Sequence, residues 1–403
     1  MTSPLHERLA AFTSTKVDAL IAAHLPGFRI PGIFAGHLVA PDVRADLAFT
    51  LGLLGAYGIE RAGGLPIDDA LEVVLAPTDG AGTHTFFSYR VAETLLRNPA
   101  LVERFDESTR RRLFDACDST SFLPRLTAGE LPRNYAAVLL RCEAARARLD
   151  QAVDPDVLDD LTTRTVALLD ANPGGYLDDS QSRIGRYDIY SGDIYLFTEP
   201  VADRLGAVWR GGARSALDLV DRIAATNGAA FSWGRSSGAL ATCLTIELAG
   251  LATGHELVDD PRRWLARGEH AFGHIDRWFA DDGVITAHQH RSTFGYRGPF
   301  RRLQMTLDCL GKLADTALVL QRADGDGVPV SGEHDLFPPR DELIAFETER
   351  PAAVWTYRSR DLAFVLPLVG STVGDYLPTP RNPGLFEVPV DTDLPTGVPT
   401  VFR

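Results

Sequence analysis

The spacing of apolar residues predicts a largely helical protein from Pro4 to about Arg322. Apolar side chains recur at intervals of three and four residues, which places them along one face of an α-helix. No part of this stretch shows a convincing alternation of apolar and polar residues, the pattern of a half-buried strand. The helical pattern is clearest in segments 43–57, 85–96, 135–149, 155–169, 206–225, 238–252, 261–279 and 301–320.

Residues that start helices agree with this pattern. Asp154-Pro155 and Asp260-Pro261 each place an aspartate at the cap and a proline in the first turn. About a dozen helices without a sequence repeat fit two architectures, a helical solenoid and a closed ring of helix pairs, the α/α toroid. A solenoid usually shows a fixed period of about thirty to fifty residues, and this chain shows none. We therefore expect an all-α major domain with the α/α toroid fold.

The pattern changes near Asp324. Apolar and polar residues alternate from Ala352 onwards, which predicts two to four strands. We therefore divide the chain into an α/α toroid catalytic domain (1–322), a linker (323–350) and a short β-rich C-terminal segment (351–403). A segment of about fifty residues is too small for a β-sandwich of its own. The strands are thus expected to lie on the helical domain, or to join a larger sheet with residues beyond Arg403 or with another chain, such as a second copy.

The composition narrows the class of partner. The 403 residues carry a net charge of −14, so nucleic acid and an anionic membrane surface would be repelled. The N-terminus lacks the features of a signal peptide, and the best apolar run, 45–57, is too short to span a bilayer. The four cysteines lie far apart without metal-ligand spacing, which favours reduced, buried thiols in a cytoplasmic protein. We expect no metal and no cofactor.

Segment 183–195, RIGRYDIYSGDIY, concentrates tyrosines, aspartates and arginines. These side chains can donate protons, hold carboxylates and bind hydroxyl groups. On a helix, residues 188 and 195 would share a face. The alternative is that the tyrosines are half-buried core residues whose hydroxyls satisfy the aspartate. The candidate catalytic residues here are Tyr187, Asp188, Tyr190 and Tyr195, and the candidate binding residue is Arg186.

Segment 231–240, FSWGRSSGAL, combines a flat aromatic ring with a cation. Trp233 offers a face on which a sugar ring can stack. Arg235 can hold an anion beside the start of the apolar helix that follows. The alternative is an ordinary capped helix whose arginine pairs with a nearby aspartate.

Other candidate residues lie outside these two segments. His288 and His290, two residues apart, can supply a general base near neutral pH. Arg291 and Tyr296 follow them as candidate binding residues, although the whole stretch could instead be a surface loop held by its own hydrogen bonds. Asn134 opens an apolar helix, where it could bind a carboxylate or a hydroxyl group, or simply cap the helix.

The order of these motifs resembles that of a bacterial family of uncharacterised α/α-toroid proteins related in fold to heparinase-type polysaccharide lyases. The resemblance covers roughly residues 130–320, from Asn134-Tyr135 to Asp282-Gly283-Val284. Segment 231–240 is also similar to one in unsaturated glucuronyl hydrolases. Two positions depart from the family pattern: Ile189 replaces an aromatic residue, and Leu196 stands where the family tends to have histidine. The closest matches are Arg186, Asp188, Tyr190, Gly234, Arg235 and Ser236.

The resemblance implies chemistry on an acidic sugar. We expect a carbohydrate-active enzyme that cleaves a glycosidic bond next to a uronic acid in an acidic oligosaccharide, by β-elimination or by hydrolysis. In elimination, Asn134 and Arg235 would hold the substrate carboxylate while Tyr190 or His288 removed the α-proton, and a second tyrosine, Tyr187 or Tyr195, would protonate the leaving oxygen. In hydrolysis, Asp188 would be the general acid or base.

The spacing of two aspartates bears on the choice between elimination and hydrolysis. On a helix, Asp188 and Asp193 would point about 140° apart, too far for a retaining pair of carboxylates, which slightly favours elimination.

Two other functions are compatible with the sequence. A second hypothesis keeps the toroid for an isomerase, dehydratase or cyclase of a small apolar metabolite, and predicts an apolar pocket. A third hypothesis is a non-enzymatic helical binding module, which predicts that the candidate residues are scattered and buried apart.

Overall fold

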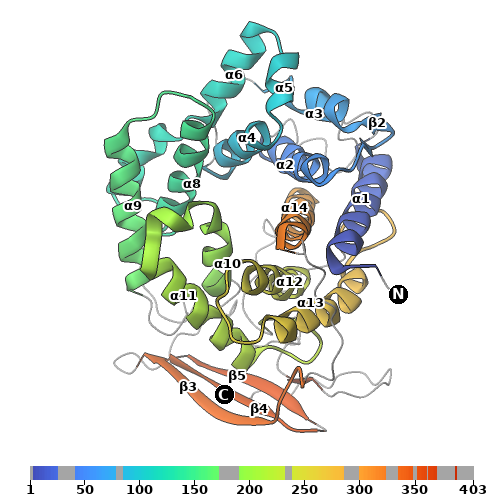
Figure 1. Ribbon diagram of the computed structural model, residues 1–403, viewed down its shortest axis with the longest axis vertical. Helices are drawn as coiled ribbons and strands as arrows, with labels where there is room; N and C mark the ends of the chain where they lie inside the picture. Colours follow the sequence, from blue (N-terminus) through green and yellow to red (C-terminus); the bar gives the residue numbers. More distant parts are fainter. Residues whose placement is uncertain are drawn as a thin grey trace.

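The computed structural model describes residues 3–25, 41–78, 85–171, 190–231, 238–285, 299–323, 335–347, 352–360, 362–369 and 386–387. Helices make up most of the described chain, and a small antiparallel sheet lies near its C-terminal end (Figure 1). Among the described residues, no helix is long and apolar enough to cross a membrane.

One set of helices gathers around the middle of the molecule (Figure 1). Each helix of the set packs against the next in chain order, and the last packs against the first. The set comprises α2 (Pro41–Tyr57), α4 (Thr85–Arg97), α8 (Tyr135–Arg148), α10 (Tyr190–Phe197), α12 (Ala239–Gly254) and α14 (Pro299–Ala323).

The remaining helices lie outside this central set. They cover it in order: α1 packs on α14, α3 on α2, α6 on α4, α9 on α8, α11 on α10, and α13 on α12. Their bounds are α1 (Leu5–His24), α3 (Ile67–Leu75), α5 (Pro99–Arg104), α6 (Glu107–Cys117), α7 (Leu123–Thr127), α9 (Pro155–Asp170), α11 (Ala202–Ile223) and α13 (Pro261–Ile275). Short 3₁₀ turns connect some of them: η3 (Thr120–Phe122), η5 (Glu199–Val201) and η6 (Asp276–Trp278).

The helices confirm most of the predicted segments. The Asp154 carboxylate accepts a hydrogen bond from the N–H of residue 156 at 2.9 Å, and that of Asp260 accepts one from residue 263 at 3.1 Å, so both predicted caps form. The helix expected to begin at Gly206 instead begins at Ala202. Gly206 interrupts it with φ 60° and ψ −136°, a conformation that glycine adopts without a steric penalty.

Two strands lie within the part of the chain predicted to be entirely helical. β1 (Arg61–Ala62) and β2 (Leu65–Pro66) form an antiparallel hairpin. Its two-residue turn consists of Gly63 and Gly64, with φ 58° and 81°. Positive φ at both turn positions matches the right-handed twist of the two strands. Strands of two residues are too short to show an alternating pattern.

The C-terminal sheet is antiparallel, with the strand order β3-β4-β5-β6. It lies on the helical part of the molecule, which is one of the arrangements expected from the sequence (Figure 1). The Thr356 hydroxyl donates to the backbone oxygen of Arg222 at 3.2 Å. The prediction of a continuous linker over 323–350 is wrong for 340–347, because charged residues hide the alternation of this strand. The strands are β3 (Arg340–Glu347), β4 (Ala352–Arg358), β5 (Ala363–Val369) and β6 (Phe386–Glu387).

A buried ionic cluster joins this sheet to the helices. Asp221, on α11, lies 2.7 Å from both Arg263 and Arg267 of α13, and 3.6 Å from Arg340 of β3. Arg267 is only 1% exposed. Burial, opposed by Asp221, lowers the pKa of Arg267 to about 10. One carboxylate therefore holds three elements together.

The cysteines are buried free thiols, as their dispersed positions predicted: Cys117, Cys142, Cys243 and Cys309. Burial raises the pKa of Cys117 to about 12, so this thiol is protonated and unreactive at neutral pH.

Candidate functional site

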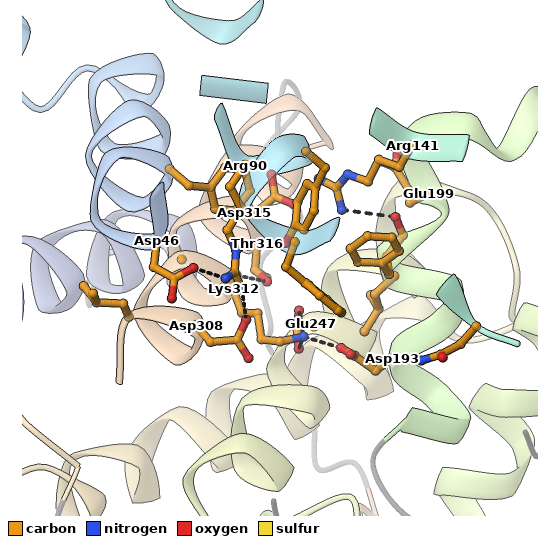
Figure 2. Close-up of a pocket in the computed structure, with 18 of the residues that line it drawn as sticks. Asp46, Arg90, Arg141, Asp193, Glu199, Glu247, Asp308, Lys312, Asp315 and Thr316 are labelled. Carbon is orange, nitrogen blue, oxygen red and sulfur yellow. Dashed lines mark hydrogen bonds and ion pairs between the residues drawn. The ribbon is translucent and has the colours of Figure 1, made fainter. Parts of the chain in front are cut away.

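A cavity of about 340 Å³ lies among the central helices. Figure 2 shows charged side chains from several of these helices pointing toward one another around it. Aromatic rings form part of its wall: Phe49, Phe86, Tyr89, Tyr135 and Phe197. Charged side chains from several helices also line it: Asp46, Arg90, Arg141, Asp193, Glu199, Glu247, Asp308, Lys312 and Asp315.

The aromatic rings of the wall pack against one another. The rings of Tyr89 and Phe197 meet edge to face with centroids 5.0 Å apart, and those of Phe86 and Tyr135 do so at 5.7 Å. Such packing fixes ring orientation and leaves a flat apolar surface beside polar groups. A ligand with one apolar face and several hydroxyl groups suits this combination.

One group of charges centres on Arg90, from α4. Its guanidinium donates to Asp46 of α2 and, at 2.9 Å, to Asp308 of α14. Asp46 is 1% exposed. Its Oδ2 atom is buried and has no hydrogen-bond partner among the described residues. Arg90 therefore aligns two carboxylates along the cavity, and one retains an unused acceptor.

A second group centres on Lys312, from α14. Its ammonium donates to Asp193 of α10 and lies 3.3 Å from Glu247 of α12 (Figure 2). Burial raises the pKa of Glu247 to about 8; the positive charge of Lys312 opposes this rise, and the carboxylates of Asp193 and Asp308 add to it. At Glu247, burial and the two neighbouring carboxylates outweigh the attraction of Lys312. Glu247 is therefore the lining carboxyl group best placed to carry a proton near neutral pH.

A third group lies around Arg141, from α8. It donates to Glu93 at 2.8 Å and to the backbone oxygen of Phe197 at 3.1 Å. Burial alone would raise the pKa of Glu93, yet Arg141 and Arg97 together lower it to about 2. The Nη2 atom of Arg141 is buried, and no described residue accepts a hydrogen bond from it. Arg141 thus brings an unused donor to the cavity wall.

Asn134 is the predicted binding residue that the structure places on the cavity. It stands at the N-terminal cap of α8, but its side chain makes no capping hydrogen bond. Its Oδ1 atom is buried and has no partner within the described residues. Asn134 precedes Arg141 by seven residues, which puts both on one face of the helix. The two side chains supply polar atoms to the same wall.

Tyr195 does not lie on the cavity, and its predicted role as a proton donor is corrected here. Its side chain is 1% exposed and packs against Gly212 of α11. The Trp209 indole donates to its backbone oxygen at 3.0 Å. Burial raises the pKa of Tyr195 to about 12. The alternative interpretation, a core tyrosine, describes this residue.

Most other predicted site residues lie outside the described part of the chain. The backbone of Tyr190 begins α10, but its side chain is not described. Whether the candidate residues of segments 183–195 and 231–240 lie together in one site is therefore not tested. The residues concerned are Arg186, Tyr187, Asp188, Trp233, Arg235, His288, His290, Arg291 and Tyr296.

Sequence reasoning missed most of the charged residues that line the cavity, Glu247 and Arg141 among them. Glu247 and Arg141 each interrupt a long apolar run, ALATCLTIELAGLA and YAAVLLRCEAA. A charge in a helix that is apolar all round has no solvent-facing side, so it must be paired inside the protein. The signal in the sequence is thus a single charged residue within an apolar run, not a dense cluster of polar residues.

Comparisons with known proteins do not identify a relative. No protein-family model matches the chain, and a search of curated proteins finds no significant match. The resemblance to α/α-toroid lyases and glucuronyl hydrolases therefore remains a prediction from short motifs. Within the described ranges, no group of three or more His, Cys, Asp or Glu residues is arranged to hold a metal ion.

Proposed function

We propose that this protein is an enzyme that cleaves a glycosidic bond in an acidic oligosaccharide by hydrolysis, in the central cavity. The supporting observation is a buried carboxyl group, Glu247, which lies 3.3 Å from Lys312 in a cavity lined by further carboxylates and aromatic rings; burial raises its pKa to about 8. Glycoside hydrolysis commonly uses two carboxyl groups, one protonated and one ionised.

The roles follow from the surroundings of each group. Glu247 would donate its proton to the leaving glycosidic oxygen. Asp308, held by Arg90 at 2.9 Å, would accept a proton from the attacking water. Lys312 would position Glu247 through its 3.3 Å contact. General acid–base catalysis of this kind contributes about 10²–10⁴-fold to the rate.

The acidic character of the substrate rests on Arg141. Its unused N–H can donate to a carboxylate, while the unused Oδ1 of Asn134 can accept from a hydroxyl group of the same sugar. The predicted partner Arg235 lies outside the described residues. The side chains proposed as the base for elimination, Tyr190 and His288, are not among those described, so elimination stays the alternative.

The other hypotheses have less support. A pocket for a small apolar metabolite would contain few charges, whereas this cavity contains ion pairs from several helices. A non-enzymatic module would not need a carboxyl group of raised pKa beside other carboxylates in a cavity. We further propose that the helices form an α/α toroid, because the contacts of the central helices return from α14 to α2. The cytoplasmic location also stays a proposal.

A screen of acidic oligosaccharides tests the proposal. Both reactions release a reducing end, but only elimination makes an unsaturated product that absorbs in the near ultraviolet. On a substrate that is turned over, Glu247→Gln and Asp308→Asn should each lower kcat by about 10²-fold or more. The control Asp218→Asn, an exposed carboxylate of α11 (67%), should leave kcat unchanged.

The proposal fails if both site variants retain full activity. An ultraviolet-absorbing product without an equivalent of water consumed would replace hydrolysis with elimination.

A further inference from the structure

A second cavity, of about 570 Å³, adjoins the first. It lies among α4, η5, α11 and the C-terminal ends of α8 and α14. Glu199 and His255 line both cavities and are joined by a hydrogen bond of 2.9 Å. Their side chains therefore form part of a shared wall.

Three exposed arginines from different helices line the second cavity: Arg148, Arg210 and Arg322. None forms an ion pair with a carboxylate in the part of the chain that the structure describes. Arg210 uses one nitrogen to donate to the backbone oxygen of His255 at 3.2 Å. Arg97, which also lines the cavity, is already committed to Glu93 and Asp315, each at 3.2 Å. The guanidinium groups of Arg148, Arg210 and Arg322 can therefore bind an anion in this cavity.

The carboxylates of this cavity do not cancel that charge. Glu93 lies between Arg97 and Arg141, which already neutralise it. Glu199 is bound by His255, whose hydrogen bond is the main cause of its lowered pKa, and Arg141 and Arg322 add to the lowering. Asp203 is the remaining lining carboxylate, in a cavity that three exposed arginines also line. A positive pocket thus occurs in a chain of net charge −14.

The backbone leaves room in front of these arginines. Gly206 lines the cavity at the interruption of α11. No atom lies within 4 Å of the position that a Cβ atom would take there. An open glycine beside guanidinium groups lets a ligand approach the main chain closely.

We propose that the second cavity binds the anionic group of a sugar, a carboxylate or a sulfate ester, through Arg148 and Arg322. Guanidinium groups bind planar and tetrahedral oxyanions with paired, charge-assisted hydrogen bonds. The choice of a sugar rests on the proposed function, because the shared wall places this anion site beside the proposed site of hydrolysis. The second cavity then determines which charged oligosaccharides the enzyme accepts.

Calorimetric binding to the full chain tests this. The probes are glucuronate, glucose 6-sulfate and glucose, which lacks an anionic group. Glucuronate, the sulfate or both should bind, and the Arg148→Ala/Arg322→Ala double variant should bind the anion at least about tenfold more weakly. Glucose should show no such difference. Affinity for the anion should also fall as salt is raised, because the arginines are exposed.

The matched control is Arg111→Ala/Arg262→Ala, which removes the same charge from exposed positions outside both cavities. The inference is overturned if neither anion binds, if the double variant binds the anion as the wild type does, or if the control weakens binding equally. If the anion binds through Arg148 and Arg322 but no acidic oligosaccharide is cleaved, the proposed function fails and the anion site stands. If an acidic oligosaccharide is cleaved with a KM that does not depend on Arg148 or Arg322, the proposed function stands and the anion site fails.

Discussion

Lys312 interacts with three carboxyl groups, those of Asp193, Glu247 and Asp308. The pKa of Glu247 is raised, mainly by burial. The folded-state pKa of about 8 lies above the ordinary value of 4.5. Between these two values the folded state binds a proton that the unfolded state has released. The free energy of unfolding therefore falls as pH rises from 4.5 to about 8, by at most about 1.4 kcal/mol per pH unit.

Glu247→Gln should remove this pH dependence. The amide keeps the shape of the neutral acid and cannot ionise. We expect the variant to gain stability relative to the wild type as pH rises from 5 to 9, measured by urea unfolding at each pH. Glu103→Gln, an exposed glutamate of α5, serves as the control and should show a constant difference. A wild-type protein whose stability relative to Glu247→Gln does not change with pH would contradict the assignment of the proton.

The same proton predicts the pH profile of catalysis. Glu247 must be protonated to act as the general acid, so kcat on a cleaved oligosaccharide should decline as pH rises through about 8. The decline should be absent from the residual activity of Glu247→Gln. An alkaline limb that persists unchanged in this variant would belong to another group.

Single residues differ in how well the sequence predicted them. Asn134 was found because it stands at the start of an apolar helix. Glu247 was not, because its pKa depends on Asp193 and Asp308, which come from other helices. Tyr195 was misassigned because a tyrosine at a helix position looks the same in sequence whether it faces a cavity or the neighbouring helix.

The packing of α10 on α11 predicts opposite effects for two adjacent glycines. A Cβ atom at Gly212 would lie 2.4 Å from the Tyr195 ring, whereas one at Gly211 meets no atom within 4 Å. Gly212→Ala should destabilise the protein by about 2 kcal/mol through overpacking. Gly211→Ala should stabilise it by about 0.5–1 kcal/mol, because alanine suits a helix interior better. Chemical denaturation measures both, and equal effects would contradict the buried position of Tyr195.

A helix or strand could be predicted where its apolar residues recur with the regular spacing of that element. The apolar runs of α2, α8, α9 and α12 define helices close to the observed bounds. The β1–β2 hairpin is too short to show a period, and only Gly63-Gly64 indicates it. Strand β3 was missed because Arg340, Asp341 and Glu342 place consecutive charges at its start.

For the molecule as a whole, the ionic cluster around Asp221 attaches the sheet to the helices. Asp221→Asn would leave the buried Arg267 and its neighbours without their anion, and should destabilise the protein by about 3 kcal/mol. The control Asp218→Asn removes an exposed carboxylate on the same helix and should cost about 0.5 kcal/mol or less. Comparable losses in the two variants would show that the cluster does not hold the sheet.

The central cavity itself could not be derived from the sequence. Its charges come from helices that are far apart along the chain, and their meeting depends on how α14 packs between α2 and α12. Periodicity indicates which face of a helix is apolar, but it does not indicate which helices share that face. The positions that line the cavity are thus a property of the assembled fold.

Helix α12 has every residue from Ala239 to Ala252 buried. A helix with no face toward water cannot open by itself, because local fraying would expose apolar surface on all sides. Its amide protons should therefore exchange with deuterium only when the entire chain unfolds, more slowly than those of the amphipathic α11 or α13. Glu247 therefore lies on the helix whose backbone amide protons should exchange most slowly.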